Sequence, residues 1–182
     1  RMQELQVIFN GLAQGCIYGL IAMGFVLIYK ATETVSFAQG DLMMLGAFCG
    51  LALTQWLGWP YWLGVPCAML AMGISGWLME MAIIRPILGQ PAFSVVMLTF
   101  GMGYVARGLI TMIPNVGTDT HAFPTPYSDI TYTISGMVIG ASHLVVLVTT
   151  AVLCAVLYLV FSRSRLGIAM QAASQNQLAA YY

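Results

Sequence analysis

Long apolar runs, separated by short polar or proline-containing stretches, recur along the whole chain. The first run, residues 7–29, makes roughly 34 Å of α-helix, enough to cross a hydrocarbon core of about 30 Å with some tilt. Four similar runs follow it. The pattern predicts five membrane-spanning helices, at residues 7–29, 36–57, 61–84, 93–113 and 144–161.

Residues at the predicted helix ends agree with these bounds. Ser36 and Gln39 match the S-x-x-Q capping box, in which side chains satisfy the free N–H groups at a helix start. Arg85-Pro86 ends the third helix, because the residue before a proline is disfavoured in helical geometry. Pro114 ends the fourth helix in the same way.

The longest segment between predicted spans, residues 114–143, contains a strict alternation of apolar and polar residues at 130–135. Gly136 and a second apolar run follow, so the segment predicts a small β-hairpin. The hairpin either covers an outward-facing cavity or only connects two spans, and both interpretations stay open.

The composition places the outer surface of the protein in lipid. Apolar residues make up 60% of the chain and charged residues 7%, whereas soluble domains carry about 25% charged residues. The net charge is zero and no basic cluster is present, which argues against nucleic-acid binding. We therefore expect an all-α integral membrane protein with a small extracytoplasmic β-hairpin, folded as a single transmembrane domain over residues 1–182.

The basic residues predict the orientation in the membrane. Lys and Arg in short loops favour the cytoplasmic side. With the N-terminus outside, Lys30, Arg85, Arg163 and Arg165 all fall inside, and Arg1 falls outside. We expect the N-terminus outside the cell and the end at residue 182 in the cytoplasm.

Enzyme and metal motifs are missing from the sequence. The only lysine, Lys30, follows Tyr29, so there is no Walker A loop for ATP. His121 and His143 lack partners at a metal-ligand or catalytic spacing. The four widely spaced cysteines fit small hydrophobic core residues better than a soft-metal site. We expect no catalytic residues, no metal and no cofactor.

Three ionisable residues, Asp41, Glu80 and Arg107, lie within predicted spans, where charged groups are costly and often functional. Glu80 and Arg107 are close enough to helix ends for their charged groups to reach the membrane surface. Asp41 has a shorter side chain. It either belongs to a translocation path or complements the dipole at a helix start.

Glycines repeat every four residues in the first predicted helix, at Gly11, Gly15 and Gly19. Such G-x-x-x-G faces let another helix backbone approach closely. Gly46 and Gly50 form the same pattern in the second helix. The glycines predict helix packing and do not distinguish between channels, carriers and receptors.

Several segments, taken in order along the chain, resemble segments of one protein family. They are Asn10-Gly11-Leu12, Tyr18-Gly19-Leu20-Ile21-Ala22-Met23-Gly24, Leu27-Ile28-Tyr29, Ser36-Phe37-Ala38-Gln39-Gly40-Asp41 and Met44-Leu45-Gly46-Ala47, followed by Arg85-Pro86, Leu98-Thr99-Phe100-Gly101 and Ser164-Arg165-Leu166-Gly167-Ile168-Ala169-Met170 with Ala172. In this order they resemble the N-terminal portion of the branched-chain amino-acid ABC transporter permeases. Members of that family continue with further spans.

This resemblance implies a permease subunit of an ABC importer in the bacterial inner membrane, moving branched-chain or similar amino acids inward by ATP-driven alternating access. The implied partners are a second homologous permease, two cytoplasmic ATPase subunits and a periplasmic substrate-binding protein. ATP hydrolysis is then expected in the partner subunits.

The candidate path or gating residues lie at the start of the second helix and in the fourth. A polar helix start flanked by small residues allows close approach of backbone and solute; the alternative is a helix start that only fixes packing. The residues are Phe37, Gln39, Gly40, Asp41, Thr99 and Gly101.

The resemblance also implies that residues 163–182 form the cytoplasmic loop that docks on an ATPase. The candidate coupling residues are Arg163, Arg165, Gly167, Ala169, Met170 and Ala172. Ile168 and Gln171 stand where relatives often have basic residues.

Three other functions stay open. A related permease for urea or short amides shares the scaffold, and fold does not settle function. A stand-alone secondary carrier or channel would concentrate paired charges or an interrupted helix near the midplane, and the sequence shows neither clearly. A structural or assembly protein would move no solute.

Overall fold

The computed structural model describes residues 2–87, 89–134 and 137–175. The chain forms two compact units, one made of Arg1–Glu33 with Pro126–Tyr182 and the other of Thr34–Thr125. The described residues are mostly helical, with one small β-sheet.

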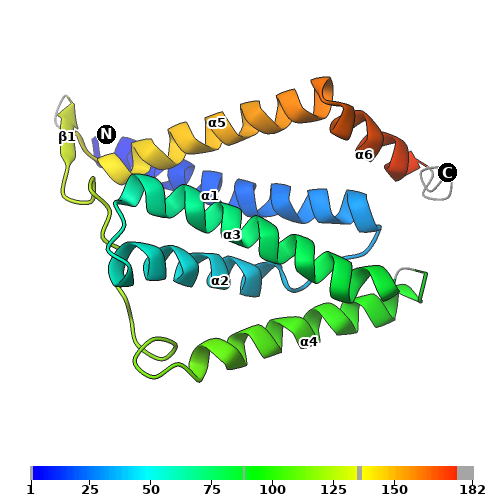
Figure 1. Cartoon of the computed structure of the whole chain (residues 1–182). Coiled ribbons are helices and arrows are strands. Elements are labelled where there is room, and N and C mark those ends of the chain that lie inside the picture. Colours follow the sequence, from blue (N-terminus) through cyan, green and yellow to red (C-terminus); the bar gives the residue numbers. More distant parts are fainter. Residues whose placement is uncertain (1, 88, 135–136, 176–182) are drawn as a thin grey trace. The chain divides into compact units, whose positions relative to one another are not determined.

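The first unit is built on two long helices. Its elements are α1 (Met2–Thr32), β1 (Thr131–Ile134), β2 (Met137–Gly140), α5 (Ala141–Arg163) and α6 (Arg165–Gln175). Helix α5 lies along α1 (Figure 1). Ala13 is buried in this unit, and Cys154 Sγ lies 3.8 Å from Met23 Sδ. Cys154 is half-buried at this contact, so its role as a core residue stays a prediction.

The predicted hairpin is confirmed. Strands β1 and β2 are antiparallel, with Thr131 opposite Gly140 and Ile134 opposite Met137. The Ala141 N–H donates to the Ile130 carbonyl at 2.9 Å, so α5 begins directly at the end of the hairpin. Residues 135 and 136 lie outside the described part of the chain.

The second unit has α2 at its centre, packed against both α3 and α4. Its elements are α2 (Gln39–Leu51), the π-helix η1 (Ala52–Trp56), α3 (Tyr61–Met79), the π-helix η2 (Glu80–Ile84), the 3-10 turn η3 (Arg85–Ile87) and α4 (Ala92–Thr111). Helix α4 ends shortly before Pro114, as predicted. The predicted stop at Arg85-Pro86 is wrong, because Arg85 keeps right-handed helical geometry and the helix continues through the 3-10 turn to Ile87.

Small residues hold α2 close to α3. A Cβ added at Gly50 would lie 3.9 Å from the Cβ of Ala68, and one added at Gly64 would lie 2.6 Å from Thr54 Cγ2. The Gly46 and Gly50 pair does face a neighbouring helix. The G-x-x-x-G prediction for the second helix is thus confirmed.

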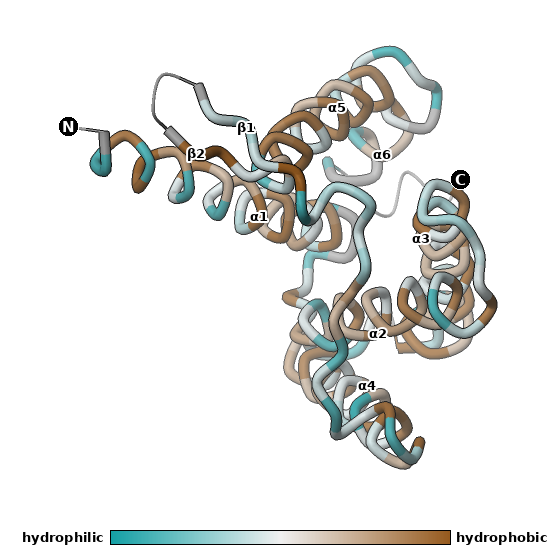
Figure 2. The backbone as a smooth tube through the Cα atoms, turned by 90° about the vertical axis from the view of Figure 1, so that its left-hand side faces the viewer, coloured by the Kyte–Doolittle hydropathy of each residue, from teal (hydrophilic) through white to brown (hydrophobic). Residues whose placement is uncertain are grey.

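Four helices in the described part of the chain are long and apolar enough to cross a membrane: Gln3–Lys30, Tyr61–Ile87, Ala92–Thr111 and Ala141–Arg163. Figure 2 shows hydrophobic residues along the length of α5. The protein is an all-α membrane protein. The second predicted span, 36–57, is also helical but differs from the other four, because its α-helical part has 13 residues and includes Asp41.

The predicted capping box at Ser36 is wrong. Helix α2 begins at Gln39, Ala38 is its N-cap residue, and no side chain caps it. Ala38 already has right-handed helical geometry, and its carbonyl accepts from the Leu42 N–H at 2.9 Å. Ser36 therefore precedes the helix start, and its side chain is buried instead.

The substitution Gly64→Ala tests the contact between α3 and η1, the continuation of α2. The added methyl group meets Thr54, so we expect the free energy of unfolding to fall by about 1–3 kcal/mol. In a Thr54→Ser background the clash is removed while the hydroxyl remains, and the loss should disappear. Unfolding in mixed micelles measures both effects.

Gly73→Ala on the same helix is the matched control, because no atom lies within 4 Å of the added methyl group. It should leave stability unchanged or raise it by up to about 1 kcal/mol, the helix propensity of Ala over Gly. Equal effects at positions 64 and 73 would contradict the contact.

Candidate functional site

The segment before α2 is fixed to the middle of α4. The Phe37 N–H donates to Thr99 Oγ1 at 3.2 Å, and the Phe37 ring stacks on Phe100 with centroids 4.6 Å apart and planes 12° apart. Thr99 is only 2% exposed, and its hydroxyl donates to the Val96 carbonyl at 2.8 Å. Two predicted path residues, Phe37 and Thr99, are therefore in direct contact.

This contact places the start of α2 inside the span and not at its end. About 10 Å of helix rise separates Ala92, the first residue of α4, from Thr99. The sequence instead predicted a helix that starts at residue 36, at the membrane surface. At such depth, non-helical backbone is tolerated only where it is buried in protein or lines a water-filled cavity.

Asp41 on α2 and Arg107 on α4 form an ion pair. Arg107 Nη2 lies 2.8 Å from Asp41 Oδ1; the Arg107 side chain is 61% exposed and that of Asp41 16%. A Cβ on residue 103 would overlap the Asp41 carboxylate, so Gly103 provides the space for it.

The sequence did not reveal this pair and showed no clear paired charges near the midplane. The structure corrects this expectation by bringing Asp41 and Arg107 together. The two residues are 66 positions apart, and each was assigned a separate role. The signal lay in the helical spacing of three or four residues along the buried face of α4, which contains the contacts of both Phe37 and Asp41. Its residues are Val95, Thr99, Gly103, Ala106 and Ile110.

The other predicted path residues lie elsewhere. Gly40 and Gly101 are exposed, and no atom lies within 4 Å of a Cβ added at either one. Gln39 lines a groove of about 600 Å³ between α2 and α3. Gln39 is the polar side chain among apolar or small lining residues, which are Leu42, Met43, Gly46, Ala47, Gly50, Val65, Ala68, Met69, Met72 and Phe123.

Helix α6 is fixed to the end of α5 by a tight turn. Ser164 is extended, and its Oγ accepts from the Gly167 N–H at 3.3 Å, which caps the start of α6. Gly167 is buried, and a Cβ there would overlap the backbone of Val160 and Phe161. Gln171 Nε2 also donates to the Phe161 carbonyl at 3.4 Å.

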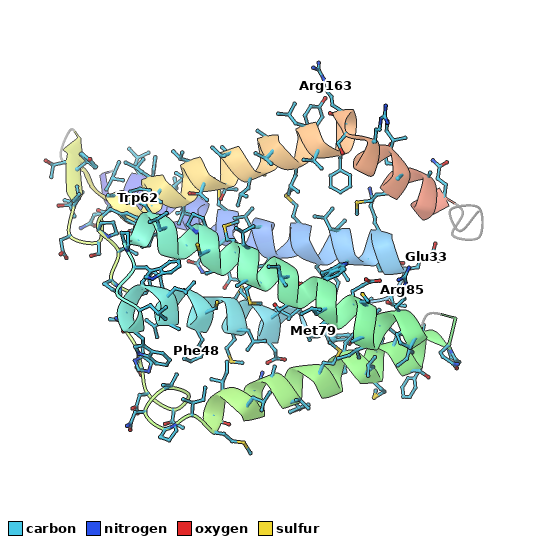
Figure 3. The ribbon with its side chains drawn as sticks, viewed as in Figure 1. Glu33, Phe48, Trp62, Met79, Arg85 and Arg163 are labelled. Atoms are coloured by element: carbon cyan, nitrogen blue, oxygen red, sulfur yellow. The ribbon has the colours of Figure 1, made fainter. Side chains whose placement is uncertain are left out.

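The remaining candidate coupling residues are exposed. Arg163 points away from the ribbon at the end of α5 (Figure 3). Ile168, one of the departures from the family pattern, is exposed on α6 as well. The other exposed candidates are Arg165, Ala169, Met170 and Ala172. Gly167 thus shapes the turn, and the others present a surface.

Gly11, Gly15 and Gly19 are exposed along α1, and no atom lies within 4 Å of a Cβ added at any of them. Within its unit, α1 contacts α5, and Met23, four residues after Gly19, lies against Cys154 of α5. A packing role for the glycines stays a prediction.

No metal centre is formed by the described residues, which contain no group of three or more His, Cys, Asp or Glu side chains that could hold an ion. His121 Nε2 lies 3.1 Å from the Val116 carbonyl, a contact within its own loop.

Comparison with known proteins gives one family. Residues 7–182 match the family described as branched-chain amino acid transport system / permease component. No solved structure matches the chain significantly.

The curated relatives carry the same description. The chain is 28% identical to the high-affinity branched-chain amino acid transport system permease protein BraD of Pseudomonas aeruginosa, over 94% of this chain and 59% of the relative. It is 25% identical to the corresponding LivH protein of Escherichia coli K12, over 59% of this chain and 38% of the relative. A probable LivH of Methanocaldococcus jannaschii is 24% identical over 86% of this chain. The chain spans about three fifths or less of these relatives' lengths.

The substitution Thr99→Val tests the attachment of α2. Valine keeps the shape but removes the acceptor for the Phe37 N–H, so we expect a loss of about 1–3 kcal/mol in unfolding free energy. Thr99→Ser keeps the hydroxyl and should retain more of the stability. Thr99→Val unfolding like the wild type would show that the hydrogen bond does not hold the helix start.

Proposed function

The chain belongs to the family of branched-chain amino acid transport permease components, and from this premise we propose that it is the membrane-spanning permease subunit of an ABC importer. The cargo we propose is branched-chain or similar amino acids, moved into the cytoplasm. The observation that carries the proposal is the family match over residues 7–182, joined to a structure with four helices able to span a membrane.

The proposal assigns the energy source to partner subunits. These are two cytoplasmic ATPases, acting with a second homologous permease and a periplasmic substrate-binding protein. The membrane is the bacterial inner membrane, with the N-terminus outside and the end at residue 182 in the cytoplasm. The positions of Lys30, Arg85, Arg163 and Arg165 at or near the ends of helices support this orientation.

The translocation path, in this proposal, runs past the start of α2. The six path residues named from the sequence are its candidates, and Arg107 joins them. The support is physical: a non-helical segment and an ion pair at span depth are tolerated where they adjoin protein or water, not lipid. Transport of a polar solute needs such a polar region within an otherwise apolar helix bundle.

Helix α6 is the proposed docking element for an ATPase. The cap from Ser164 and the close fit of Gly167 attach α6 firmly to α5, which packs on α1. A displacement of α6 would therefore be passed to two membrane-spanning helices. We also propose that residues 1–182 form a single transmembrane domain.

Uptake measurements test the cargo. In a strain lacking its own importer, expression of the complete subunit set should raise uptake of labelled leucine severalfold and leave labelled urea unchanged. ATP depletion should abolish the increase. Uptake of urea alone would support the amide permease, transport that persists without ATP would support a carrier, and no increase in leucine uptake would reject the proposal.

The substitution Ala169→Asp tests the docking of α6. Residue 169 is exposed, so we expect the stability of the chain to stay within about 0.5 kcal/mol of the wild type. Co-purification with the ATPase subunits should fall at least severalfold, because an acidic group is introduced into the contact.

Gly167→Ala provides the comparison, because its added methyl group overlaps the end of α5 and should displace α6. It should reduce both stability and co-purification. Unchanged ATPase recovery with both variants would contradict a docking role for α6.

A further inference from the structure

The Asp41–Arg107 ion pair lies within the span and is not explained by packing. Arg107 lies about 22 Å of helix rise from Ala92 and about 6 Å from Thr111, the last residue of α4. The described residues offer the Arg107 guanidinium no hydrogen bond other than the one to Asp41. With its side chain 61% exposed, Arg107 retains most of its donors for another group.

The direction of the Arg107 side chain is informative. Sequence reasoning allowed its guanidinium to reach the nearby membrane surface, since α4 ends at Thr111. The guanidinium instead turns to Asp41 on α2. Charged residues in spans generally face a bundle interior or a water-filled cavity, so the exposed side of this pair indicates a polar space and not lipid.

The chemistry of the pair matches an α-amino acid. Such a solute carries a carboxylate and an ammonium group on adjacent positions. A guanidinium binds a carboxylate through two parallel N–H donors, and a carboxylate accepts from an ammonium group. A zwitterion can therefore replace one ion pair by two, with no charge left uncompensated. Urea and simple amides carry no such charges.

We propose that the Asp41–Arg107 pair is a binding site for the charged groups of zwitterionic α-amino acids, which open the pair as they bind. The inference rests on the proposed transport function and names its substrate-reading residues. The solute carboxylate binds Arg107 and the solute ammonium binds Asp41. Gly103 keeps the space beside the Asp41 carboxylate free of a side chain.

An apolar surface adjoins the charged site. Phe37 lies four residues before Asp41, in the turn that leads into α2, and its ring stacks on Phe100. These rings are 47% and 40% exposed. We expect the aliphatic side chain of a zwitterion bound at Asp41 and Arg107 to contact these rings, which favours leucine-like solutes over polar amino acids.

Binding of labelled leucine to the purified permease–ATPase complex, without the binding protein, tests the site. Wild-type binding should be competed by unlabelled leucine at least tenfold better than by leucinamide, which lacks the carboxylate, or by isocaproate, which lacks the ammonium. Arg107→Gln should weaken leucine binding at least tenfold and remove the preference over leucinamide. Asp41→Asn should remove the preference over isocaproate.

Arg85→Gln is the matched control, the same substitution at an exposed arginine outside the pair, and should leave binding unchanged. If a single variant fails to fold, the double variant Asp41→Asn/Arg107→Gln restores a neutral hydrogen-bonded pair and should still bind leucine poorly. A purely structural pair predicts lowered thermal stability with unchanged ligand preference.

The two proposals fail in different ways. Leucine uptake by the intact importer, with no leucine binding by the complex or with binding unchanged by Arg107→Gln, overturns the site and leaves the transport function standing. A wild-type importer that neither binds nor transports leucine overturns both.

Discussion

A backbone N–H inside a membrane needs a hydrogen-bond acceptor, and this need governs the arrangement of α2. The chain is not helical just before Gln39, so the Phe37 N–H has no carbonyl one turn earlier to bind. Thr99 on α4 supplies the acceptor from a buried position, while its own proton goes to the Val96 carbonyl. An unsatisfied N–H in hydrocarbon would cost several kcal/mol. The helix start and α4 are therefore fixed to each other.

The polar character of the unit follows from that attachment. Because α2 starts beside Thr99, its first turn places Asp41 deep in the span, where the carboxylate also complements the positive end of the helix dipole. A lone carboxylate there would be costly, and Arg107 compensates it. Gly103 allows the two helices to approach closely enough for this pair to form. Backbone hydrogen bonding, charge and small residues on α4 thus act together.

Much of the fold could be predicted from local signals. Apolar runs and prolines located α1, α3, α4 and α5, and the alternation before Gly136 located the hairpin, because these features depend on neighbouring residues. The start of α2 could not be predicted in this way. Ser36 offered a good local cap, but burial near α4 took precedence, and no local pattern contains that contact.

The candidate site was predicted by residue but not by arrangement. The resemblance pointed to Phe37, Asp41 and Thr99, and the structure places these residues where the start of α2 meets α4. The resemblance did not pair Asp41 with Arg107, because 66 residues separate them and ion pairing depends on tertiary structure. At the end of α5 the motif around Gly167 had a structural cause, the tight turn into α6, which only the fold reveals.

The depth of residue 40 in the bilayer tests the central claim most directly. Spin labels attached to cysteines at positions 40, 92 and 101, in a chain whose native cysteines are replaced, report depth by their collision rates with oxygen and a polar relaxing agent. Residues 40 and 101 are glycines with open space around them, so the labels should be tolerated. We expect the label at 40 to lie at the depth of the label at 101, about 10–15 Å deeper than the label at 92. A label at 40 as shallow as the label at 92 would contradict it.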